Sequence, residues 1–350
     1  MGVPFDITDQ AVLTDLIHRP ITTQFEDQPR LGDLIAPVKS IPGRVAKIRT
    51  MQTQAFGLGQ FKSPDGSPAL YTPSSSWSES IIELALLEEM HRISGEDWMK
   101  LNSRDENVRR AAGVEIVDRG KVLQLRNERL TEWMRWQAFT GELTLTYPTG
   151  SQAYINYGFT SAQKPTVSTA WSNVSSADPI TDMRSWSTTI ASLSGYYGVR
   201  YHMSSDTFDY IVRNTNVRNL LTATDRALLV PTKADILSLL RDGTDIVIYD
   251  NGYRDDTVGT SRGVPDSLTR FLPLGKVLVT TEYQIEGQNI AETLDGQVLI
   301  NGGYNEAVIA NGPQSEVMYD QMSKNHFFRV ASARVPRIVY PECFLYATVI

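Results

Sequence analysis

A serine in a glycine-flanked pentapeptide, with a histidine far downstream, is the pattern in this sequence that comes nearest to covalent catalysis. Gly-Thr-Ser-Arg-Gly at 259–263 matches the G-x-S-x-G nucleophile elbow of serine hydrolases, and His326 follows in the order those enzymes use. The elbow requires a buried strand before the serine and a helix directly after it. Here two aspartates precede the segment and Pro265 follows it, which suits a polar loop better. We therefore favour a loop, and a serine hydrolase that uses Ser261 stays an alternative.

Other residue types that support chemistry are scattered along the chain. The four histidines are isolated and only one cysteine is present, so no Cys/His cluster with zinc spacing exists. No glycine-rich phosphate loop is present, and the acidic pairs lack the spacing of a calcium loop. The sequence therefore predicts no catalytic residue, no metal ligand and no cofactor.

Composition limits the class of protein. A chain of 350 residues with 41% hydrophobic content can bury a large core and usually forms more than one domain. The net charge is −7 with both signs mixed, which argues against a strongly basic nucleic-acid surface. A single cysteine, Cys343, excludes an internal disulfide and suits a reducing compartment. No secretory signal is visible, and no apolar run approaches the roughly 18 residues of a membrane span. We expect an intracellular, soluble protein with no membrane partner.

The first 45 residues look like an extended arm. Five prolines interrupt them, and each proline removes a backbone hydrogen-bond donor. Only residues 8–19 have helical spacing, and Pro20 ends that segment. Apolar residues such as Leu31 and Ile35 need a surface to cover them, and that surface could belong to another subunit.

A long hairpin is predicted next, over residues 46–92. Two β-prone arms flank a turn at Asp65-Gly66. A two-stranded hairpin is marginal alone in water, so we expect it to pack against something else. Its descending part, Ser-Ile-Ile-Glu-Leu-Ala-Leu-Leu-Glu-Glu-Met at 80–90, favours a strand over a helix.

Residues 104–140 carry the strongest helical pattern. An apolar stripe runs along this segment through Leu123, Leu130, Trp133 and Met134. We expect Trp133 to face the core and Trp136, which has polar neighbours in the sequence, to be partly exposed or at a subunit boundary. The mixed charges of the segment favour a solvated, salt-bridged face over a polyanion site.

Short strands alternate with helices after residue 143. Helices are predicted over 179–194, 205–221 and 232–243, the first with Asp178 as N-cap and Gly195 as its stop. Strands are predicted at 199–204, around 245–249 and at 275–281, and the chain ends in an extended stretch from residue 325 onward. This alternation predicts a mixed α+β fold.

The order of these parts resembles the major capsid proteins of tailed bacteriophages, in particular the lambda-type major capsid protein E family. Ala-Leu-Tyr-Thr-Pro-Ser-Ser-Ser from residue 69 is similar to the descending arm of that family's extended loop. Arg-Asn-Glu-Arg-Leu-Thr-Glu-Trp from residue 126, which runs on to Phe-Thr-Gly-Glu-Leu, is similar to its spine helix. Asp-Pro-Ile-Thr-Asp-Met from residue 178 and Phe-Leu-Pro-Leu-Gly-Lys-Val from residue 271 are similar to parts of its axial domain and a following strand.

This resemblance implies the tailed-phage major capsid fold. It implies an N-terminal arm (1–45), an extended loop (46–92), a peripheral domain with the spine helix (93–170), an axial domain (171–320) and C-terminal strands that return through both domains (321–350). In such a fold the loop contacts neighbouring subunits, and the residues expected to do so are Phe56, Phe61, Lys62, Leu70 and Tyr71.

The resemblance also implies a function. Members assemble with copies of themselves into hexamers and pentamers of an icosahedral head around double-stranded DNA. Scaffolding, portal and decoration proteins are the further partners expected, with assembly in the host cytoplasm and a final place in the virion. An encapsulin-type nanocompartment shell shares the fold and stays the main alternative; shells that hold an enzyme instead of DNA would favour it.

Overall fold

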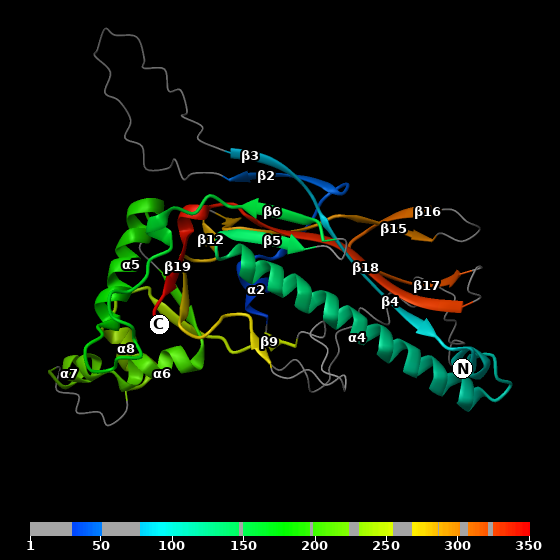
Figure 1. The fold of residues 1–350 in the computed structure, drawn as a ribbon, viewed down its shortest axis with the longest axis horizontal. Helices are drawn as coiled ribbons and strands as arrows, with labels where there is room; N and C mark the ends of the chain where they lie inside the picture. Colours follow the sequence, from blue (N-terminus) through cyan, green and yellow to red (C-terminus); the bar gives the residue numbers. More distant parts are fainter. Residues whose placement is uncertain are drawn as a thin grey trace, which may run out of the picture.

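The computed structural model describes residues 30–50, 78–146, 150–196, 199–223, 231–254, 268–285, 287–301, 307–320 and 325–350. The fold mixes helices and strands, as predicted, and Figure 1 shows two regions. In one region a long helix lies beneath a set of strands. In the other region, at the opposite end of the molecule, several shorter helices lie together. Within the described residues, no helix combines the length and the apolar character needed to cross a membrane.

The long helix is α4 (Glu106–Ala138), which spans 33 residues and therefore about 50 Å. Its N-cap, Asp105, accepts a hydrogen bond from the Asn107 amide at 2.9 Å. Gly113 and Gly120 weaken its helical propensity, but both lie on its buried side, where packing stabilises the helix. A short helix before it, α3 (Gly95–Leu101), is capped by Ser94.

The first sheet packs on α4 and is built around one long strand, β18 (Asn325–Ile338). One edge of β18 pairs with β4 (Ala85–Ile93). The other strands are β17 (Gln314–Asp320), which pairs with the first half of β18, β14 (Ala291–Asp295), which pairs with its second half, and β1 (Val38–Ser40), which runs parallel to β14. The expected strand at 80–90 is thus confirmed, as β3 (Ser78–Glu83) leading into β4.

The second sheet has the order β19-β11-β7-β8. Its strands are β7 (Arg200–Met203), β8 (Asp245–Ile248), β11 (Lys276–Thr280) and β19 (Phe344–Thr348). The surrounding helices are α5 (Pro179–Ser194), α6 (Ser205–Arg213), α7 (Thr215–Ala223) and α8 (Lys233–Ser238). The N-cap Asp178 and the left-handed Gly195 of α5 are as predicted.

Two helix predictions need correction. The single helix expected over 205–221 is two helices, because Asn214 takes an extended backbone and its side chain bonds to the Ala177 carbonyl and the Val217 amide. The helix expected over 232–243 ends at Ser238, and a turn follows it.

The remaining elements are short. They are α2 (Leu31–Ile35), the 3-10 turns Ser161–Gln163 and Pro341–Cys343, and the hairpin-like pairs β2–β3 (Val45–Thr50 with Ser78–Glu83), β5–β6 (Glu142–Thr146 with Gln152–Asn156), β9–β10 (Gly252–Tyr253 with Thr269–Arg270), β12–β13 (Gln284–Ile285 with Gln288–Asn289) and β15–β16 (Gln297–Asn301 with Ala307–Asn311).

The last strand connects the two main hydrophobic clusters. Phe344 is buried with the residues around α4 and the first sheet, whereas Leu345 and Ala347 are buried among α5 to α8. A third, smaller cluster lies between the first halves of α4 and β18, where Ile116 and Val117 meet Phe328 and Val330. The C-terminal strands therefore link the two regions of the molecule.

Candidate assembly site

The predicted apolar stripe of the spine helix is only partly buried within this chain. Met134 is buried in the main core, and Trp133 packs against that core while half-buried. Leu123 is half-buried against the third cluster. Leu130 is 43% exposed, so its predicted role in core packing is wrong for the isolated chain.

The predicted exposure of Trp136, and with it the order of burial of the two tryptophans, is also wrong. Trp136 is 3% exposed and is therefore more buried than Trp133. Its ring stacks on Tyr249 at 5.1 Å and meets Phe139 edge-on at 5.6 Å. The predicted apolar stripe assumes that only one side of the helix is covered. The C-terminal part of α4 is covered by the sheet and, in addition, by α2 and the residues after β8.

Glu132 is the centre of a buried polar cluster at this end of α4. Its side chain is fully buried, and its Oε1 accepts hydrogen bonds from the Gly32 amide at 2.9 Å, the Trp136 indole at 2.8 Å and the Tyr249 hydroxyl at 2.9 Å. Burial raises the pKa of Tyr249, so its phenol stays protonated and can donate. A Cβ at residue 32 would lie 2.3 Å from Glu132 Oε2, so only glycine lets the carboxylate approach this amide.

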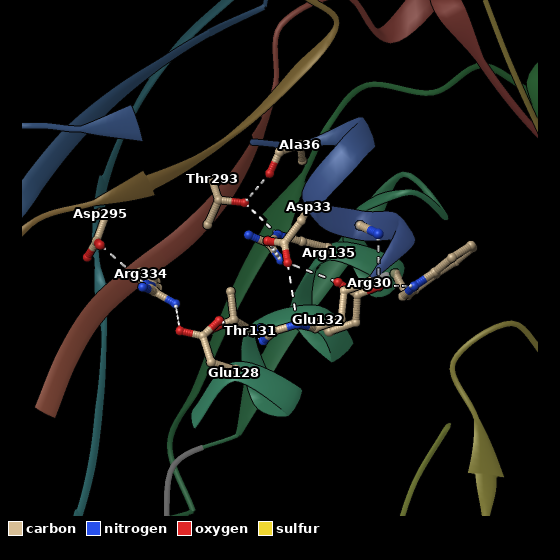
Figure 2. A network of polar contacts seen from close by, with 12 residues as sticks. Arg30, Asp33, Ala36, Glu128, Thr131, Glu132, Arg135, Thr293, Asp295 and Arg334 are labelled. Atoms are coloured by element: carbon tan, nitrogen blue, oxygen red, sulfur yellow. Dashed lines mark hydrogen bonds and ion pairs between the residues drawn. The ribbon is translucent and has the colours of Figure 1, made fainter. Parts of the chain in front are cut away.

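Arg135 connects the same helix to the N-terminal segment and to the sheet. Its guanidinium is fully buried and lies 2.6 Å from Asp33 and 3.3 Å from Glu132. Its Nε donates to the Thr293 hydroxyl at 2.7 Å, and that hydroxyl donates to the Ala36 carbonyl at 2.8 Å. Figure 2 shows these side chains converging between α2, α4 and β14.

A second group of ion pairs centres on Glu128, one turn earlier on α4. Its two carboxylate oxygens accept from Arg334 at 2.8 Å and from Arg30 at 2.9 Å, and Arg334 also lies 3.4 Å from Asp295 (Figure 2). Burial by itself would raise the pKa of Glu128, but the charges of Arg334 and Arg30 outweigh burial and hold that pKa below its usual range. Burial raises the pKa of Asp295 in spite of Arg334.

Together these contacts anchor the start of the described chain on its own subunit. Leu31 and Ile35 of α2 are buried in the main core, and β1 extends the first sheet. The surface that covers these two residues therefore belongs to the same chain and not to another subunit. This cluster could not be recognised in the sequence, because Glu128, Glu132 and Arg135 have the spacing of an ordinary solvated helix face.

The described residues include His326 but not Ser261. They contain no group of three or more His, Cys, Asp or Glu side chains that could hold a metal ion. His326 lies at the start of β18, stacked on Trp98 with ring centroids 3.6 Å apart and close to Tyr319 at 4.8 Å. Burial lowers its pKa. These contacts give it a packing role at the end of the sheet.

The sequence family fits this architecture. The family model described as phage major capsid protein E matches residues 19–297, well over half of the chain. The chain belongs to the phage major capsid protein E family. No curated protein matches the sequence of this family member.

Solved structures share the fold of this phage major capsid protein E family member. A phage-related protein from Bordetella bronchiseptica RB50 has 13% identity and a TM-score of 0.54, covering 97% of this chain and 96% of its own. A putative prophage capsid protein from E. coli CFT073 has 13% identity and a TM-score of 0.56, covering 96% and 97%. The holo-SrpI encapsulin complex from Synechococcus elongatus PCC 7942 reaches a TM-score of 0.47 at 8% identity, covering 95% and 91%. The first two likenesses show the fold, and the family match supports a phage capsid protein over an encapsulin.

Two sets of predicted residues of the capsid protein lie outside the described residues. The loop residues Phe56, Phe61, Lys62, Leu70 and Tyr71 belong to the segment between β2 and β3, so their contacts stay predictions. Ser261 belongs to the segment between β9 and β10. The hydrolase alternative has no support from the family, which is one of structural capsid proteins.

Proposed function

We propose that this protein is the major capsid protein of a tailed double-stranded DNA bacteriophage and self-assembles into its icosahedral head. The observation that carries the proposal is the family match over residues 19–297. The fold supports it, because nearly the whole chain aligns with the structures of a phage-related protein and a putative prophage capsid protein, at TM-scores of 0.54 and 0.56.

Assembly into hexamers and pentamers requires surfaces that reach beyond the subunit's own core. The β2–β3 ribbon is the best candidate, since Figure 1 shows it along one margin of the molecule and the chain between its strands holds the predicted contact residues. We propose that Phe56, Phe61, Lys62, Leu70 and Tyr71 contact a neighbouring subunit. Large apolar contacts of this kind are typical of obligate assemblies.

The remaining partners follow from the same proposal. A head of this kind is built with scaffolding and portal proteins, carries decoration proteins in some phages, and encloses the genome after assembly in the host cytoplasm. A subunit with a net charge of −7 would lie near packaged DNA without binding it tightly, because tight non-specific binding depends on cations that neutralise phosphates.

Sedimentation of the purified full-length protein tests self-assembly. The proposal predicts particles of several megadaltons in equilibrium with free subunits or small rings. A protein that sediments only as a monomer or dimer at every concentration and salt would contradict it. Particles that contain a co-purified enzyme would instead support the encapsulin alternative.

A further inference from the structure

The outer side of the spine helix exposes an apolar stripe that nothing in the described residues covers. Val114 is 52% exposed and Val122 is 56% exposed, although both lie within the 33-residue helix α4. Ala111 lies on the same side of the helix at helical spacing, and Asp118, whose carboxylate pairs with Lys121, lies between the two valines. Gly113, Ile116 and Gly120 lie on the buried side.

The same stretch of the helix carries a surplus of positive charge. Three ion pairs neutralise part of the charge of the helix: Arg119 with Glu115, Lys121 with Asp118, and Arg126 with Glu89. Among the described residues 104–138, the exposed side chains without an ion pair are four cations, Arg104, Arg109, Arg110 and Arg129, and two anions, Asp105 and Glu106. Four cations and two anions leave a surplus of two positive charges. The occupant of the stripe is therefore expected to be apolar and acidic.

Residues 1–29 have that chemistry. They contain five acidic residues and one arginine, a net charge of −4 with histidine neutral. The segment 8–19 has helical spacing, places Val12, Leu13, Leu16 and Ile17 together, and includes Asp9 and Asp15. An acidic amphipathic segment matches an apolar stripe with surplus arginines.

The described chain begins beside this helix. Arg30, its first residue, donates a hydrogen bond to Glu128 on α4. The distance along α4 from Glu128 to Val114 is about 21 Å at 1.5 Å per residue. A segment of this length reaches far beyond that distance at about 3.3 Å per extended residue.

We infer that the exposed apolar stripe of α4, formed by Ala111, Val114 and Val122 and flanked by Arg110 and Arg129, is the docking surface for the chain's own acidic N-terminal segment, residues 1–29. The anchor at Arg30 keeps the segment beside its surface. Docking covers the valines and neutralises the surplus charge of the helix. Duplex DNA could satisfy the arginines but would leave the valines uncovered.

Limited proteolysis of the full-length subunit tests this inference, at a concentration at which sedimentation shows a monomer. The double variant Val114→Asp/Val122→Asp should lose residues 1–29 at least tenfold faster than the wild type, because both side chains are more than half exposed and the core is untouched. Arg110→Glu/Arg129→Glu should accelerate cleavage in the same direction at low salt and less at high salt. The matched control Leu193→Asp, a 39% exposed position on α5, should leave the rate unchanged.

Three results would overturn the inference. The first is a wild-type segment that is cleaved as fast as in the double variant. The second is protection that appears only as the protein concentration rises, which would assign the stripe to another copy. The third is unchanged cleavage in both variants together with weaker binding of a short DNA duplex, which would make the stripe a DNA contact. An unchanged thermal unfolding midpoint in each variant confirms that the subunit is still folded.

Discussion

Glu132 shows how much of this molecule depends on single buried polar residues. It accepts three hydrogen bonds, from the backbone of Gly32, from Trp136 and from Tyr249, and lies against the buried Arg135. Removing one partner of such a buried pair leaves a charge unpaired in the core, which costs about 3–5 kcal/mol. A carboxylate at this position could not be recognised from the sequence, because its burial depends on α2 returning to cover it.

The two tryptophans of the spine helix should differ in the order that their burial indicates. Trp136→Ala should lower the free energy of unfolding by about 3–5 kcal/mol, because it empties a site packed against Tyr249 and Phe139 and removes a donor to Glu132. Trp133→Ala should cost clearly less, since that ring is half-buried. Urea unfolding of unassembled subunits measures both, and a larger loss at Trp133 would refute this assignment of the packing.

Lowering the pH should weaken the ion pairs that Glu128 forms with Arg30 and Arg334. Its pKa in the folded protein is below the ordinary value of 4.5, so its ion pairs stabilise the fold fully above that value, and their contribution is lost as the pH falls through the folded pKa. Glu128→Gln removes this dependence, and its stability should fall less steeply than that of the wild type between about pH 5 and pH 3. Urea unfolding across this range provides the comparison.

The buried Asp295 titrates in the opposite sense, since its raised pKa makes the folded state gain stability on protonation. Asp295 is present in both the wild type and Glu128→Gln, so the difference between their two pH profiles of stability reports on Glu128 alone. Identical pH profiles for the wild type and Glu128→Gln would show that these ion pairs do not stabilise the fold.

Helices and strands whose ends are set by neighbouring residues in the sequence could be predicted. Those whose ends or pairing depend on contacts with distant parts of the chain could not. Helix α5 has its cap, its first-turn proline and its terminal glycine within one short stretch, and the structure has the same bounds. Helices α6 and α7 were expected as one, because the break at Asn214 depends on a bond to the distant carbonyl of Ala177. The central place of β18 depends on three strands that are far apart in the sequence.

The extended loop should be needed for assembly and not for folding. Deletion of residues 55–72 leaves the β2–β3 register from Val45–Glu83 to Thr50–Ser78 intact. The shortened subunit should therefore stay soluble, with the circular dichroism and unfolding midpoint of the wild type, but should not form closed particles. A deletion variant that cannot fold would place this segment in the subunit's own core.

At the scale of the whole molecule, the order of the parts was more informative than any motif. An extended arm, a long hairpin, a spine helix and an α+β region in that order indicated the capsid family, and the family match confirms it. The site within the subunit was less predictable. Leu130 and Trp136 were misplaced, because α4 is covered on two sides near its end and left bare near its middle.

Electron microscopy of the purified full-length protein, expressed alone, tests the central claim most directly. If the chain is a major capsid protein, the images should show closed shells whose reconstruction has icosahedral symmetry, with pentamers at the fivefold vertices and hexamers between them. The subunit density should show α4 as a single rod of about 50 Å. Fields that contain only subunit-sized particles, under all conditions that keep the protein folded, would contradict the account.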